Sequence, residues 1–101
     1  MAKLEIILHE KGGDVTYKQN HVSGQKYLDF WELQEKIEAG NLTTVEIITL
    51  RLEFIAGLFS DDKLTPEQVL KGLDPWELDE TINRLNSIVL GVDQDAEKKN
   101  Q

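Results

Sequence analysis

The chain has 101 residues, of which 40% are hydrophobic and 30% charged, an ordinary composition for a globular protein. It contains no cysteine, which excludes disulfides and thiolate chemistry, and no apolar run approaches the ~20 residues of a membrane-spanning helix. The formal net charge is −8 and there is no basic patch, so direct binding to nucleic acid or to an anionic membrane is not expected.

A β-hairpin is predicted over residues 3–22. Leu4, Ile6 and Leu8 stand at every second position, the period of a strand with one buried face. Adjacent glycines within residues 10–14 tolerate the positive φ angles that a hairpin turn needs. Because a lone hairpin is marginally stable in water, we expect its Leu4 side to lie on helices. Pairing of an exposed strand edge with a second copy of the chain is the alternative.

A first helix is predicted over residues 24–39, with Ser23 as its N-cap and Gly40 as the residue that ends it. Its apolar side chains recur at helical spacing and fill one arc of the circumference. Trp31 lies within this arc, so we expect it in the core.

The central helix is predicted over residues 44–59, TVEIITLRLEFIAGLF, and Thr43 with Glu46 gives it the sequence of a capping box. Its polar residues share one stripe, and the rest of its circumference is apolar apart from Arg51. A helix of this kind is normally covered by several neighbours. Gly57 is expected to permit close backbone approach by a neighbour, either within the domain or from another subunit. The two apolar faces consist of Val45, Ile48, Leu52, Ile55 and Phe59, and of Ile47, Leu50, Phe54 and Leu58.

Two more helix starts follow, at Thr65-Pro66-Glu67-Gln68 and at Asp74-Pro75-Trp76-Glu77. Each has a capping residue, a proline at the first helical position and a glutamine or glutamate that completes a capping box. Gly72 and Gly91 are predicted to end these helices at the residue after the C-cap. Residues 92–101 show no periodicity and are predicted to form a disordered charged tail.

The predicted fold class is therefore α+β and predominantly helical. An N-terminal β-hairpin is followed by three main helices and one short connector helix, in a single globular domain over residues 1–91.

The sequence lacks the known nucleophile motifs, metal-binding motifs and glycine-rich phosphate loops. His9 and His21 flank the hairpin, where two strands could bring them together for metal binding, although surface histidines are expected. Asp61, Asp62 and Glu67 do not have the spacing of a calcium-binding loop. We therefore expect a protein without enzymatic activity, cofactor or metal.

Two residues depart from the patterns of their helices. Arg51 must either pair with a carboxylate inside the domain or extend to solvent where the two apolar faces diverge. Trp76 lies off the apolar stripe of its helix, and we expect it to pack on the short helix through Leu70 or Leu73. An exposed Trp76 would instead be an anchor for a partner.

Four segments occur in the order KYLDFWELQEKIEAG, IITLRLEFIAGLF, LTPEQVLKGLDPWELDETINRLNSIVLG and a charged tail with EKKN. This order resembles the tail assembly chaperones of long-tailed phages that infect Gram-positive hosts. The resemblance implies a non-enzymatic protein that binds the hydrophobic tape measure protein, keeps it soluble and helps to recruit the tail tube protein. It also implies a place in the cytoplasm of the bacterial host and not in the mature virion.

Such a chaperone needs more apolar surface than its own core uses. We assign a candidate partner-binding surface, for the client or for self-association, to Ile47, Arg51, Phe54, Leu58 and Trp76. The alternative is that both faces of the central helix are buried inside one monomer.

A different class of function is a small acidic regulatory or inhibitory module that mimics the charge of nucleic acid. It would require carboxylates gathered on one face, and here they are spread over several predicted elements.

Overall fold

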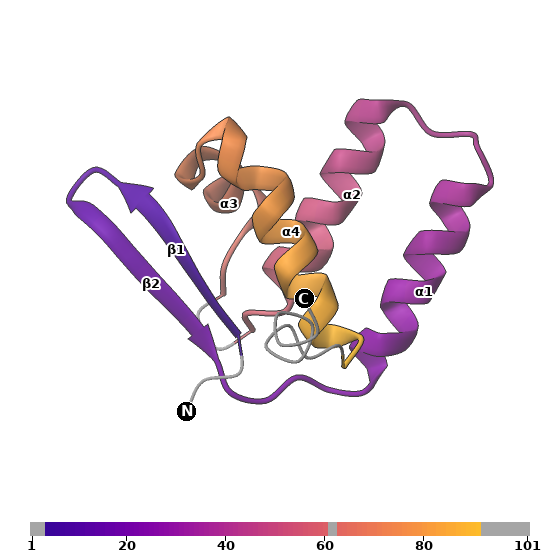
Figure 1. The fold of residues 1–101 in the computed structure, drawn as a ribbon, viewed down its shortest axis with the longest axis horizontal. Coiled ribbons are helices and arrows are strands. Elements are labelled where there is room, and N and C mark those ends of the chain that lie inside the picture. The colour runs from indigo at the N-terminus through magenta and orange to yellow at the C-terminus, as the bar shows by residue number, and fades with distance from the viewer. Residues whose placement is uncertain (1–3, 61–62, 92–101) are drawn as a thin grey trace, which may run out of the picture.

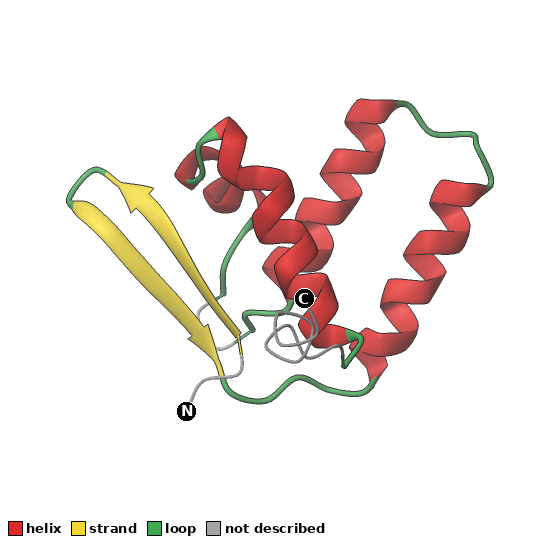
Figure 2. Cartoon of the chain, in the orientation of Figure 1, coloured by secondary structure: helices red, strands yellow, loops and turns green. Residues whose placement is uncertain are grey.

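The computed structural model describes residues 4–60 and 63–91, and its element order confirms the predicted α+β, predominantly helical class (Figure 1). The hairpin lies at one end of the molecule and the helices pack beside it (Figure 2). The elements are β1 (Leu4–Glu10), β2 (Gly13–Gln19), α1 (Gln25–Glu38), α2 (Thr44–Gly57), α3 (Pro66–Gly72) and α4 (Pro75–Val89). The predicted tail over residues 92–101 lies outside the described residues, as do Asp61 and Asp62.

The hairpin is antiparallel and in register from Leu4 opposite Gln19 to Glu10 opposite Gly13. Leu4, Ile6 and Leu8 are at most 1% exposed, because this face of β1 packs against α3 and α4. The expectation that the hairpin buries this side on helices is therefore confirmed.

From α2 onward, the helices begin at the predicted capping motifs. Each of α2, α3 and α4 begins with a capping box, at Thr43/Glu46, Thr65/Gln68 and Asp74/Glu77. Helix α1 differs, because its N-cap is Gly24 and not Ser23. The Ser23 hydroxyl still accepts a 3.2 Å hydrogen bond from the Gln25 backbone N–H.

Two of the three glycines predicted to end helices do so with positive φ, Gly40 at 80° and Gly91 at 81°. Gly72 is different, since it is the buried last residue of α3 and does not have positive φ. A Cβ on Gly72 would lie 2.7 Å from the Leu8 Cβ. The glycine at this position therefore serves the close approach of β1 to α3.

Gly57 differs from Gly72, because the close approach expected there does not occur within the domain. A Cβ there would meet only the flexible end of Lys26, with Nζ at 3.4 Å. Helix α2 ends at this glycine, two residues earlier than predicted, and Leu58 and Phe59 enter the core just beyond it.

The core lies where the hairpin, the C-terminal half of α2, α3 and α4 meet. It comprises Leu4, Ile6, Leu8, Leu52, Ile55, Ala56, Leu58, Phe59, Leu64, Val69, Ile82 and Leu85. Helix α1 stands at its periphery, in contact with α2 and α4, and only Phe30 of its side chains is buried. In the described part of the chain, no helix combines the length and apolar character needed to cross a membrane.

Candidate protein-binding surfaces

The apolar side chains of α2 are more exposed in the first half of the helix and more buried in the second half. Val45 in its first turn is 72% exposed, and Ile47 and Leu50 are half-buried, whereas Leu52 and Ile55 are buried. Helices α3 and α4 lie beside the C-terminal half of α2, and α1 runs alongside α2, with Phe30 on Phe54 (Figure 1). We call residues 25–53, which comprise α1, the connecting loop and α2 as far as Glu53, the helical arm.

Aromatic side chains on α1 extend the exposed apolar surface of the helical arm. Tyr27 and Trp31 make an edge-to-face contact with centroids 6.4 Å apart, and Trp31 packs likewise on Phe30 at 5.2 Å. Phe30 in turn contacts Phe54 of α2 at 5.9 Å. The expectation that Trp31 lies in the core is wrong, because Phe30 faces α2 and leaves Trp31 45% exposed.

A shallow groove of about 250 Å³ lies on the helical arm near the loop that joins its two helices. Its apolar lining includes Leu42, Val45 and Leu50, and the carboxylates of Glu46 and Glu53 stand along it. Exposed Leu28 adds to the apolar surface of α1.

Trp76 is the most exposed large apolar residue of the described chain, with 77% of its surface accessible. The predicted packing of this indole on α3 is therefore wrong. It stands in the first turn of α4, and Leu70 of α3 is also exposed. A large exposed indole is the kind of side chain that anchors protein interfaces when a partner covers it.

The structure distributes the five predicted partner-binding residues over different environments. Ile47, Arg51 and Phe54 are half-buried, and Trp76 is exposed. Leu58 is only 2% exposed and belongs to the core, so its assignment to a partner surface is wrong. Arg51 forms no ion pair with any described carboxylate, so of its two predicted alternatives the internal pair is not found among the described residues.

Sequence reasoning missed four exposed apolar residues: Tyr27, Leu28, Val45 and Leu70. One signal was present, because Leu28 lies outside the apolar arc of its helix. Val45 gave no such signal, since it shares a helix face with buried Leu52 and Ile55.

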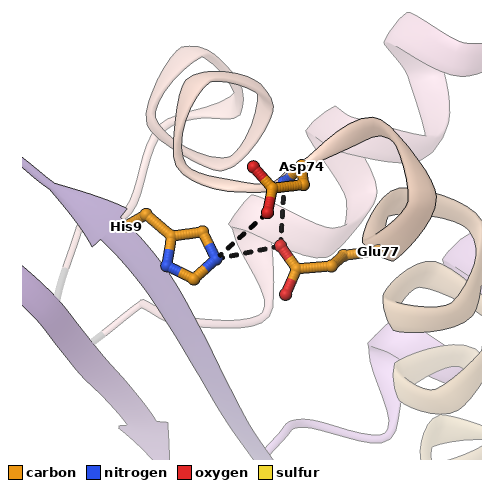
Figure 3. A group of neighbouring side chains, drawn as sticks. All are labelled: His9, Asp74 and Glu77. Carbon is orange, nitrogen blue, oxygen red and sulfur yellow. Dashed lines mark hydrogen bonds and ion pairs between the residues drawn. The ribbon is translucent and has the colours of Figure 1, made fainter.

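The structure brings the titratable residues His9, Asp74 and Glu77 together (Figure 3), and Asp14 also bonds His9. His9 Nδ1–H donates to Asp14 Oδ1 at 2.8 Å, and Nε2–H donates to Glu77 Oε1 at 3.0 Å. Asp74 Oδ2 is 3.8 Å from Nε2. His9 and His21 are not brought together, because the strand register places them near opposite ends of the hairpin.

The bond to Asp14, followed by the bond to Glu77, raises the pKa of His9 to about 9. The Asp74 backbone N–H donates to Glu77 and lowers the pKa of that carboxyl. Ligand atoms of His9, Asp74 and Glu77 lie within 4.8 Å of one another, a grouping that a divalent metal can use. Both imidazole nitrogens already donate to carboxylates, however, so the arrangement favours an ionic bridge between the hairpin and α4.

The ionic bridge predicts a pH dependence of stability. The His9 pKa rises from 6.5 to about 9 on folding, so its contribution is complete below pH 6.5 and is lost as pH rises through about 9. The melting temperature of the wild type, relative to that of His9→Gln, should therefore fall over this interval. The difference should shrink in high salt, because the groups are exposed. A difference that stays constant from pH 6 to pH 10 would contradict the bridge.

These features define a small acidic α+β protein whose conspicuous surface features are exposed apolar side chains on helices, as expected of a protein that binds other proteins. The chain belongs to the phage tail chaperone protein family, whose family model matches residues 1–101. No match was found among curated proteins or among solved structures. Family membership indicates a non-enzymatic role with protein partners in the phage tail.

Proposed function

We propose that this chain is a non-enzymatic tail assembly chaperone that binds and solubilises the tape measure protein and assists assembly of the tail tube. The observation that carries the proposal is the exposed apolar surface of the helical arm together with Trp76. Membership of the phage tail chaperone family supports the chaperone role, and the tape measure protein is the client that we propose for it.

A protein that holds a hydrophobic client must expose apolar surface without aggregating through it. Exposed apolar surface marks interaction sites, and a net charge of −8 makes copies of this chain repel one another. In the complex, the apolar surface of the chaperone would cover apolar segments of the client. The negative charge of the chaperone would then keep the complex soluble.

The proposed setting is the cytoplasm of a bacterial host, taken to be Gram-positive. The chaperone would hold the tape measure protein there until the tail tube protein polymerises around it. It would then leave, so that the mature virion lacks it.

Co-expression with the tape measure protein of the same phage tests this function. We expect the tape measure protein to move from the insoluble to the soluble fraction and to co-purify with the chaperone. A variant with Leu28→Ser, Trp31→Ser and Val45→Ser should fold but lose most of this effect, because three exposed apolar side chains of the helical arm are gone.

The matched control is Ile7→Ser, which removes an exposed apolar side chain from the hairpin. It should solubilise the client as the wild type does. A tape measure protein that stays insoluble and unbound beside the wild-type chaperone would refute the proposed function.

A further inference from the structure

We propose that the groove on the helical arm receives a basic amphipathic helix of the client. This inference rests on the proposed function and adds the chemistry of the segment that binds. Val45 and Leu50 give the groove an apolar lining, and Glu46 and Glu53 also line it. A helix that places apolar anchors on Val45 and Leu50 would bring its flanking side chains against these carboxylates.

The charge of the helical arm argues for a cationic occupant. Helix α1 carries four carboxylates and two lysines, and α2 carries two carboxylates and one arginine. Glu53 has no basic partner among the described residues. Lys36 is the one basic residue among those that line the groove. Lysine or arginine side chains on a bound helix would therefore meet Glu53, which has no basic partner, beside Glu46, which already accepts the Thr43 backbone N–H.

The same charges disfavour a second copy of this chain as the occupant. A second copy would bring another acidic arm and a further net charge of −8 to the contact. Like charges placed together at an interface repel each other and suppress the wrong partner. A basic segment of another protein gains from the same field, both in affinity and in association rate.

The walls of the groove argue for a helix and not for an extended strand. Its α2 wall includes Val45, Thr49 and Glu53, spaced four residues apart along one row of the helix. Such rows form ridges and grooves that receive side chains of a second helix. Backbone groups within α2 are already paired in the helix, so an extended peptide would find no strand edge to extend there.

Charge reversal at the groove tests the inference. The probes are synthetic peptides that span the tape measure protein of the same phage, with Kd measured by fluorescence anisotropy at low and high salt. Glu53→Lys should weaken binding of the tightest basic amphipathic peptide by about five- to tenfold at low salt. The loss should be much smaller at high salt, where exposed charges are screened. Glu46 is left unchanged because it caps α2.

Two further variants complete the test. Glu5→Lys makes the same change of charge at an exposed position of the hairpin that does not line the groove, and it should change Kd by less than about twofold. Val45→Ser should weaken binding at both salt concentrations, because it removes an apolar contact. Equal effects of Glu53→Lys and Glu5→Lys, or none, would overturn the inference while wild-type binding upholds the proposed function. Absence of binding by the wild type to both peptides and whole tape measure protein would refute both.

Discussion

Leu58→Ala should lower the free energy of unfolding by about 2–5 kcal/mol, the cost of emptying a buried leucine site. Leu58 lies just beyond the end of α2, is 2% exposed and belongs to the core that joins the hairpin to the helices. The matched control is Val45→Ala in the first turn of the same helix, where the side chain is exposed. That variant should change stability by less than about 0.5 kcal/mol. Urea unfolding followed by circular dichroism measures both.

This pair of variants separates the two ends of α2. If Leu58→Ala were as mild as Val45→Ala, the core would not extend to Leu58, and its assignment to a partner surface would have to be reconsidered. If Val45→Ala were severe, the helical arm would be covered in the free protein, and it would offer no client surface.

Gly72→Ala should destabilise the protein by about 1–3 kcal/mol, although alanine is the better helix former by about 1 kcal/mol. The new Cβ would lie 2.7 Å from the Leu8 Cβ, which is fixed to the backbone of β1 and cannot swing away. The hairpin must therefore shift away from α3, and the packing of the buried Leu8 side is lost.

Gly57→Ala is the control for this prediction. Its Cβ would meet only the Lys26 Nζ at 3.4 Å, and the flexible lysine can move. Thermal melts should show Gly57→Ala as neutral or stabilising by up to about 1 kcal/mol. Stabilisation by both substitutions would mean that β1 does not pack closely on α3.

Sequence reasoning predicted those parts of the fold that local chemistry determines. The capping boxes at Thr43, Thr65 and Asp74 each act within four residues, so their residue types identify the helix starts. The strand period of Leu4, Ile6 and Leu8 identifies the buried face of β1 in the same way. The structure confirms these features, which can be predicted without knowing how the elements pack on one another.

The candidate site was less predictable, because exposure depends on how far the neighbouring elements reach. Helical period assigns Val45 and Leu52 to one face, but it does not say that the first is exposed and the second buried. The sequence pattern predicts that neighbouring elements bury Trp31 and Trp76, but both side chains are exposed. The His9–Glu77 contact joins residues 68 positions apart, and no local pattern predicts it.

Hydrogen exchange of this chain, free and in complex with the tape measure protein, would locate the surface that binds the client. We expect slower exchange on binding in α1, in the first half of α2 and around Trp76, with little change in strand β1, whose Leu4 side is already buried. Protection confined to the hairpin, with the helical arm exchanging as fast in the complex as in the free protein, would contradict this expectation.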